Sequence, residues 1–87
     1  MKKLHLSLTG RWFDLTAQDK KPVEYRRMGT RLEKQILAAK PGDLVVYHRG
    51  YTSMVCIRRI TKIDIGPCPI DGWTGDFYRI HSERIKK

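Results

Sequence analysis

Cysteine is scarce in this sequence, and no spacing of metal ligands stands out. The 87 residues include two cysteines, Cys56 and Cys68, too few for the disulfide framework of a small secreted domain. Histidine occurs only at three scattered positions, without a Cys-x-x-Cys or His-x-x-x-His pair. A structural zinc site needs about four ligands at such spacings. We therefore expect reduced cysteines, no metal and no other cofactor.

Long hydrophobic runs are absent as well. No apolar stretch approaches the ~20 residues that a membrane-spanning helix needs. Residues 1–3 resemble the charged start of a signal peptide, but polar and apolar residues alternate after them, without an uninterrupted hydrophobic region. No segment combines an apolar helical face with a Lys/Arg-rich one, as a membrane-surface helix would. We expect a cytoplasmic protein that does not associate with membranes.

Acidic residues are half as numerous as basic ones. Nine Asp and Glu face eighteen Lys and Arg, which leaves a net charge of +9. The excess is +4 in residues 1–28, +2 in 29–52 and +3 in 53–87, so it does not reside in one tail. A charge of this size and spread on a small domain favours a polyanionic partner such as nucleic acid. The alternative is that the charge serves solubility alone.

The first half of the chain predicts a strand, a short helix, a second strand and a second helix. Leu4, Leu6 and Leu8 alternate with polar residues, as in a half-buried strand. Residues 11–18 form the first helix, with Trp12, Leu15 and Thr16 on one side, and 23–27 form a strand. Thr30 is a plausible N-cap for the second helix, with Glu33 as its capping-box partner and Leu32, Ile36 and Ala39 on one face.

The second half predicts three strands joined by turns. Residues 44–47 are apolar on both faces and belong at the centre of a sheet. A hairpin turn over 49–53 leads to a strand over 54–65, in which Arg58-Arg59 suggests a bulge. A Gly- and Pro-rich loop over 66–75 precedes the last strand, 76–85. No linker or repeat divides residues 1–87. The pattern favours one α+β domain, a small mixed or antiparallel β-barrel of about five strands with two short helices.

A carboxylate stands between two cations at the start of the second strand. Glu24 and Arg26 share one face, opposite Val23 and Tyr25, which we expect in the core. Pro22 favours extended backbone just before them, at Lys21. A carboxylate so flanked suits the ordering of cations or hydrogen bonding to base edges. The alternative is a surface ion pair of little consequence.

The arrangement of a strand, a short helix and a Lys-x-x-Glu-x-Arg strand resembles the start of the ASCH domain family, small β-barrels related to the PUA fold. Lys21, Glu24 and Arg26 match the family's Gly-x-Lys-x-x-Glu-x-Arg motif, with Asp19 in place of its glycine. Residues 41–43 (Pro-Gly-Asp) look like the family's Gly-Asp turn. Residues 49–51 (Arg-Gly-Tyr) are similar to a Gly-Tyr turn of small phage-like members. The resemblance spans nearly the whole chain and implies a PUA-like barrel that binds RNA or a nucleotide-like ligand.

Some members of this family cleave amide bonds in modified pyrimidine nucleosides. The resemblance places Lys21 at their lysine, but Glu24 replaces their threonine nucleophile and Arg58 falls where they carry a glutamate. Both departures remove the hydroxyl and base that nucleophilic catalysis needs. We do not expect this hydrolase activity.

Metal-independent RNA cleavage is a second enzymatic possibility suggested by the resemblance. It needs a base for the 2′-hydroxyl and cations for the charged transition state. Lys21, Arg26 and either His48 or His81 could supply these groups, but no pair of histidines is visible in the sequence. We expect the histidines to be surface or strand-edge residues.

Aromatic residues could stack on unpaired bases beside a basic groove. Trp73 lies in a loop, and Tyr51 lies at a glycine turn next to Arg49. Both are stacking candidates, although each could instead pack against the fold. Trp12, Tyr25 and Tyr47 are expected to be core residues.

The sequence thus predicts a monomeric domain that binds RNA or a nucleotide-like ligand in a cationic cleft. The rivals are an enzyme, either a ribonuclease or a modified-nucleoside hydrolase, and a protein-interaction or inhibitor module. The residues expected to line the cleft are Lys21, Glu24, Arg26, Arg49, Tyr51, Arg58 and Trp73.

Overall fold

Two strands alternate with two short helices in the first half of the chain, and three strands make up the second half. The computed structural model describes residues 2–85. Its elements are β1 (Lys3–Leu8), α1 (Gly10–Ala17), β2 (Val23–Arg27), α2 (Glu33–Ala38), β3 (Leu44–Arg49), β4 (Val55–Pro67) and β5 (Asp76–Arg84). The predicted α+β class, with about five strands and two short helices, is confirmed.

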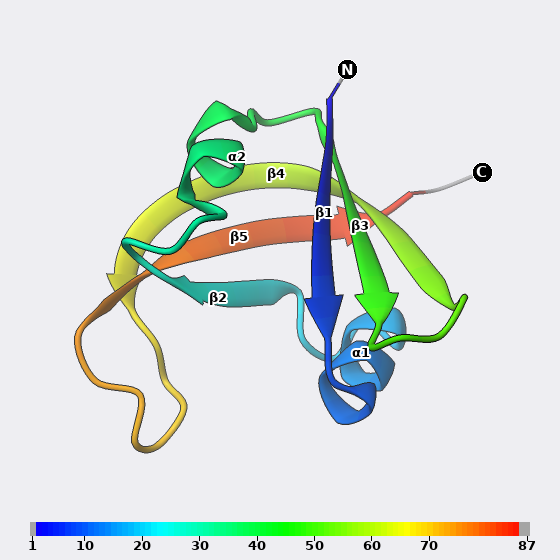
Figure 1. Ribbon diagram of the computed structural model, residues 1–87, viewed down its shortest axis with the longest axis horizontal. Helices are drawn as coiled ribbons and strands as arrows, with labels where there is room; N and C mark the ends of the chain where they lie inside the picture. The colour runs from blue at the N-terminus through cyan, green and yellow to red at the C-terminus, as the bar shows by residue number, and fades with distance from the viewer. Residues whose placement is uncertain (1, 86–87) are drawn as a thin grey trace.

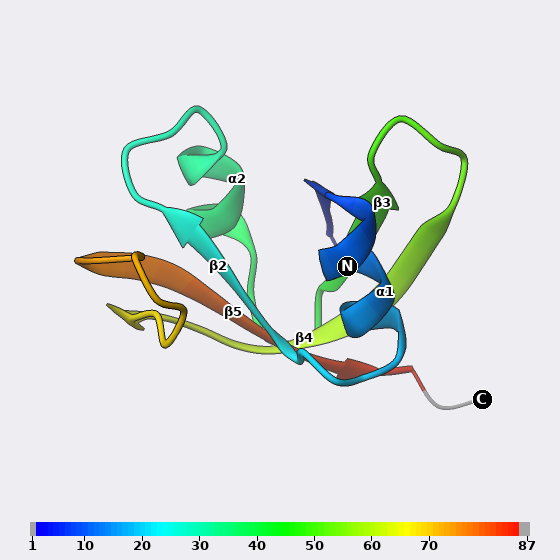
Figure 2. The ribbon, with the colours of Figure 1, turned by 90° about the horizontal axis from the view of Figure 1, so that it is seen from below.

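The strands form one mixed sheet in the order β1-β3-β4-β5-β2 (Figure 1). β1 runs parallel to β3, and the other neighbours are antiparallel. Figure 2 shows the sheet curled into a trough: β4 and β5 form its floor, with β2 and α2 on one side and β1, β3 and α1 on the other. The edge strands β1 and β2 therefore face each other across the opening. None of the helices within residues 2–85 is both long and apolar enough to cross a membrane.

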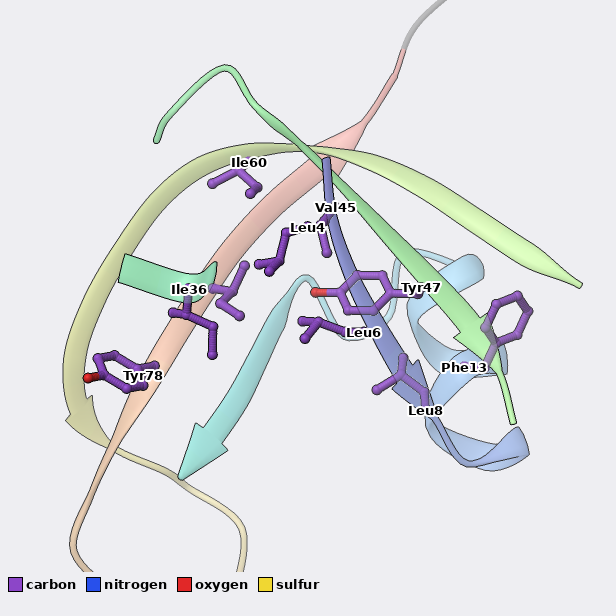
Figure 3. Packing of buried hydrophobic residues seen from close by; sticks show 10 residues of the cluster. Leu4, Leu6, Leu8, Phe13, Ile36, Val45, Tyr47, Ile60 and Tyr78 are labelled. Carbon is purple, nitrogen blue, oxygen red and sulfur yellow. The ribbon is translucent and has the colours of Figure 1, made fainter. Parts of the chain in front are cut away.

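The core fills the inside of this trough (Figure 3). Every second residue of β1 is buried, so Leu4, Leu6 and Leu8 all point inward, as the alternation predicts. They meet Tyr47 of β3, and Ile36 of α2 caps one end. Burying one such aliphatic side chain contributes ~1.5–3 kcal/mol, so the six-residue β1 depends on this face for its place in the sheet.

The expected core role of Val23 and Tyr25 is wrong. Both residues are only half-buried and lie outside the core cluster, whereas Glu24 between them is buried. β2 turns its Glu24–Arg26 face to the inside of the trough, where two cations compensate the carboxylate. Alternation alone fixed the two faces of β2 but not which one is inside, because a neutralised carboxylate can be buried.

The helix contacts differ from expectation in two respects. The inward face of α1 is made by Phe13 and Thr16 rather than by Leu15. The capping box of α2 does not form, because the helix starts two residues later than its motif suggests and its N-cap position, Leu32, makes no side-chain bond. The Glu33 carboxylate instead accepts the backbone N–H of Gly29 at 2.6 Å, which lowers the pKa of Glu33.

A bulge interrupts the pairing of β4 with β5, as predicted, although two residues further along. The register shifts between Ile60 and Lys62, not at Arg58-Arg59. The bulge lets both Ile60 and Ile63 face the core. It bends the long β4 and contributes to the curl of the sheet.

Candidate functional site

The open seam between the two edge strands is bridged by a side chain. Leu8 and Lys2 accept backbone hydrogen bonds from the β3 side. Peptide groups alternate in direction along a strand, so those of Ser7 point to the free edge. The carbonyl oxygen of Ser7 accepts a hydrogen bond from Arg26 Nη2 of β2 at 2.8 Å. Arg26 thus joins the two edges where no strand pairing does.

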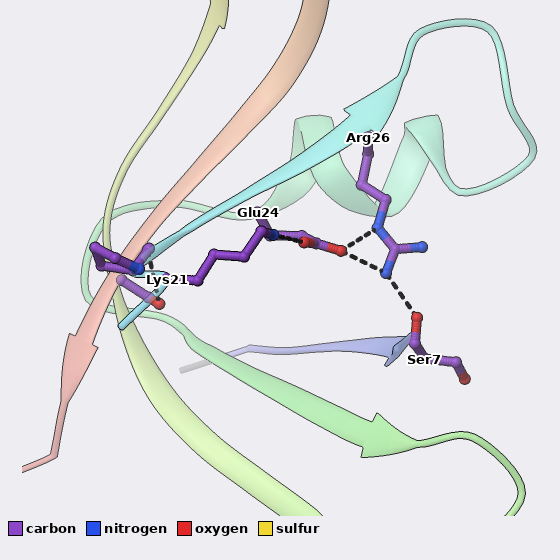
Figure 4. A network of polar contacts seen from close by, with 6 residues as sticks. Ser7, Lys21, Glu24 and Arg26 are labelled. Carbon is purple, nitrogen blue, oxygen red and sulfur yellow. Dashed lines mark hydrogen bonds and ion pairs between the residues drawn. The ribbon is translucent and has the colours of Figure 1, made fainter. Parts of the chain in front are cut away.

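Lys21, Glu24 and Arg26 form one hydrogen-bonded network along this seam (Figure 4). Lys21 Nζ lies 2.7 Å from Glu24 Oε1, and Arg26 Nε lies 3.0 Å from Glu24 Oε2. Glu24 is 8% exposed, and the side chains of Lys21 and Arg26 are 15% and 22% exposed. Both carboxylate oxygens are engaged. Within residues 2–85, Arg26 Nη1 has no hydrogen-bond partner.

Aromatic rings enclose the other cation of the network. Lys21 Nζ lies 5.1 Å from the ring centroid of Trp12 and 5.7 Å from that of Tyr25. A cation at this distance is attracted to the ring face. Lys21 is therefore held by a carboxylate and two rings, in an orientation that its flexible stem would not keep alone.

A groove of about 560 Å³ runs along the seam beside this network. Its walls come from the end of β1, from α1, from β2, from the β2–α2 loop and from the β4–β5 loop. Glu24 is the one acidic residue of its lining within the part of the chain described. The residues that line it are Ser7, Leu8, Thr9, Trp12, Glu24, Tyr25, Arg26, Arg27, Thr30, Arg31, Leu32 and Trp73.

Two smaller hollows adjoin the groove. One of about 340 Å³ contains Lys20 and Lys21 and shares Trp12 and Tyr25 with the groove. The other, of about 280 Å³, lies under Tyr51 and shares residues 7–9 with it. The groove is therefore continued by a hollow at Lys21 and another at Tyr51, and the groove and the first hollow are rich in cations.

Both aromatic residues proposed for stacking lie at this seam. Trp73 is 37% exposed; one side of it lies against Phe77, with ring centroids 5.6 Å apart, and it lines the groove. Tyr51 is fully exposed at the tip of the β3–β4 hairpin, above the adjoining hollow.

Arg49 and Arg58 do not line the groove. Arg49 pairs with Asp14 of α1, with Nε 3.3 Å from Oδ1. Arg58 is 1% exposed and donates to Ser82 Oγ, to the Ser82 and Thr16 carbonyls and to Asp19. The structure gives Arg58 a role in holding the fold, and it places Arg49 outside the network.

The groove lining includes Trp12, Arg27 and Arg31, which the sequence did not place in the cleft. Trp12, expected in the core, packs against it and also lines the groove. Arg27 ends β2 and Arg31 lies in the loop that follows it, and both line the groove. Arg27 also lies over the Phe77 ring, at 5.2 Å. The clue in the sequence was the cluster of cations around the Gly29 turn, directly after the motif strand.

The histidines lie apart from the groove. The rings of His5 and His48 stack, with Nδ1 and Nε2 3.0 Å apart, and His81 contacts Asp64 at 3.2 Å. Burial, followed by the Glu24 carboxylate, raises the pKa of Tyr47, so this phenol stays protonated at neutral pH. No group of three or more His, Cys, Asp or Glu side chains within residues 2–85 is arranged to hold a metal ion.

No protein-family model matches the chain, and no curated protein matches it in sequence. Function is accordingly inferred from the groove and the residues that line it.

Proposed function

We propose that this chain is an ASCH-type domain that binds RNA or a nucleotide-like ligand in the groove between β1 and β2. The observation that carries the proposal is the fixed guanidinium of Arg26. Glu24 and the Ser7 carbonyl hold its Nε and Nη2, while Nη1 has no partner among the described residues. The available donor belongs to a residue of the groove wall.

The chemistry of such a donor matches a phosphate or a base edge. With Nε and Nη2 engaged, the N–H groups of Nη1 remain to donate to a phosphate oxygen or to an acceptor on a base edge. Charge-assisted hydrogen bonds of this kind are about twice as strong as neutral ones. Because Arg26 is already held in place, less side-chain entropy is lost when a ligand binds. Arg27 and Arg31 add positive charge, and Trp73 adds a ring.

The enzymatic alternatives find less support in the same geometry. Both oxygens of Glu24 accept from cations, which suits a fixed carboxylate better than a proton acceptor. His5 and His48 contact each other through their ring nitrogens, and neither lines the groove. The protein-interaction alternative has no observation of its own among residues 2–85.

The test is a fluorescence-anisotropy titration with RNA, DNA and nucleotides at two salt concentrations. Arg26→Ala is compared with Arg59→Ala, which removes the same charge from an exposed residue outside the groove. Losing one desolvated, hydrogen-bonded cation costs about 1.5–3 kcal/mol, so Arg26→Ala should weaken binding more than tenfold. Arg59→Ala should weaken it less than threefold. Binding should also fall with salt, with a slope of roughly −0.7 per phosphate contacted on a single strand.

Circular dichroism of each variant controls for folding, because Arg26 also bridges the seam. Equal losses from the two substitutions would show a diffuse charge patch instead of a site. Failure of all nucleic acids and nucleotides to bind would refute the proposal. RNA recovered in fragments after the titration would favour the ribonuclease alternative.

A further inference from the structure

The groove is one part of a longer hollowed track. It shares Trp12 and Tyr25 with the hollow beside Lys21, and residues 7–9 with the hollow under Tyr51. A pocket for one small molecule occupies roughly 300–1,000 Å³, and the 560 Å³ groove alone falls in this range. The two hollows extend the track beyond the space that a single nucleotide requires.

The central cations of this track are recessed. The side chains of Lys21 and Arg26 are 15% and 22% exposed, and residues of α1 and of the β2–α2 loop flank them. A duplex is stiff, and its bases are stacked and paired inside. It could touch the rims of the groove, but it could not lower a base or a phosphate to these cations. A single strand can, because its bases are unstacked and its backbone bends.

One aromatic side chain stands in the central groove of the track and another at one of its ends. Trp73 lines the groove from the β4–β5 loop, and Tyr51 stands over the hollow at the β3–β4 hairpin. Aromatic rings combined with a cationic groove are the usual means of holding single strands without strong sequence preference. Tyr51 is fully exposed, so its ring is not used for packing against the rest of the described structure.

The strand edges add polar groups at fixed positions. Ser82 N donates to Pro22 O, so alternation directs the peptide groups of Tyr25 and Arg27 away from β5 and towards the seam. Tyr25 and Arg27 both belong to the groove lining. Unstacked bases could form hydrogen bonds with such groups, whereas bases within a duplex already use their pairing edges.

We propose that the ligand is a single strand of nucleic acid several nucleotides long, which lies along the seam from Trp73 past Arg26 to Tyr51. This inference rests on the proposed function and makes it more specific. It predicts that affinity depends on strand length and that duplexes are discriminated against.

The experiment uses fluorescein-labelled RNA oligonucleotides without self-complementarity. Lengths of about three, six and twelve nucleotides extend from below the ~4–16 nucleotides that a small single-strand-binding fold covers to well within that range. The longest is also tested as DNA and as an RNA duplex. We expect the longest single strand to bind at least tenfold more tightly than both the trimer and the duplex. If single-stranded DNA bound more tightly than the RNA duplex, the inference would cover single strands of both RNA and DNA.

Tyr51→Ala tests the far end of the track. It should weaken binding of the longest RNA about fivefold or more and leave the trimer unchanged. Met54→Ala is the matched control, because Met54 is an exposed apolar residue at the same hairpin and lines none of the hollows. It should change neither affinity.

Two results would overturn this inference while leaving the proposed function intact. One is equal affinity for the duplex and the single strand, and the other is equal affinity for the trimer and the longest strand. Equal effects of Tyr51→Ala on all lengths would likewise remove Tyr51 from the track. If no RNA, DNA or nucleotide binds, the proposed function itself fails.

Discussion

Replacing Arg58 by alanine should cost this protein a large part of its stability, far more than replacing the acidic partner of Arg58. The guanidinium is 1% exposed and lies between β5 and the end of α1. It donates to Ser82 Oγ at 2.7 Å, to Ser82 O at 2.9 Å and to Thr16 O at 3.3 Å. Its charge partner, Asp19, lies at 2.8 Å but is 45% exposed.

The loss of Arg58 and the loss of Asp19 should differ in their cost to the free energy of unfolding, because the two side chains differ in burial. Removal of Arg58 leaves buried oxygens of Ser82 and Thr16 without donors, at roughly 1–3 kcal/mol per unsatisfied group. Breaking a buried charged network costs ~3–5 kcal/mol in total, and domains of this size have only about 5–15 kcal/mol. Asp19→Ala leaves the buried Arg58 charge without its carboxylate but keeps its hydrogen bonds to Ser82 and Thr16, so it should cost less, about 1–2 kcal/mol.

A third substitution separates the ion pair from the backbone. Asp19 has φ = 60°, a left-handed conformation that is strained for residues with a Cβ and free for glycine. Asp19→Gly loses the ion pair and relieves this strain, so it should be less destabilising than Asp19→Ala by up to ~1 kcal/mol.

Urea unfolding monitored by tryptophan fluorescence measures all three variants. The expected order of destabilisation is Arg58→Ala, then Asp19→Ala, then Asp19→Gly. Arg58→Met controls for lost volume, because it retains an apolar stem and removes the charge and the donors. If Asp19→Ala were as destabilising as Arg58→Ala, the ion pair and not the buried hydrogen bonds would hold this corner. If Arg58→Met were neutral, packing would account for the whole effect.

Two further predictions concern acid stability and the core. The Arg79 guanidinium, helped by Lys62 and His81, holds the pKa of Asp64 well below its usual range. This carboxylate therefore stabilises the fold above about pH 4 and loses that effect as the pH falls. Asp64→Asn should reduce the difference in urea midpoint between pH 7 and pH 3, and an unchanged difference would contradict the role of Asp64 in acid stability. Ile36 is the one buried residue of α2 in the described structure. Ile36→Ala should cost ~2–5 kcal/mol in the same assay, and Ile36→Val ~0.5–1.5 kcal/mol; equal losses would mean that α2 is not anchored there.

Local patterns, such as the alternation in β1 and the apolar run in β3, predicted most of the elements. Leu4, Leu6 and Leu8 predicted both the strand and its inward face, and the helical spacing of Leu32, Ile36 and Ala39 predicted the face of α2 that packs on the core. The order of strands did not follow from these patterns. The parallel pairing of β1 with β3 joins distant segments, and its register depends on how the whole sheet curls.

The candidate site was predicted in part, and the predictions about it that were wrong have one cause. The sequence indicated that Lys21, Glu24 and Arg26 act together, and the network confirms their proximity. It could not show that Glu24 faces inward or that Arg58 is buried, because charged residues are buried only when distant partners compensate them. For Arg58 the partners include Ser82, 24 residues away.

The arrangement of the two edge strands has a consequence for aggregation. A free strand edge can pair with another molecule, and natural proteins cover or charge such edges. Here both edges of the sheet face the same seam, and the guanidinium of Arg26 occupies the space between them. An incoming strand from a second molecule would have to enter a cationic groove and displace that side chain. The groove proposed to hold a ligand thus also keeps the edges of the sheet from pairing between molecules.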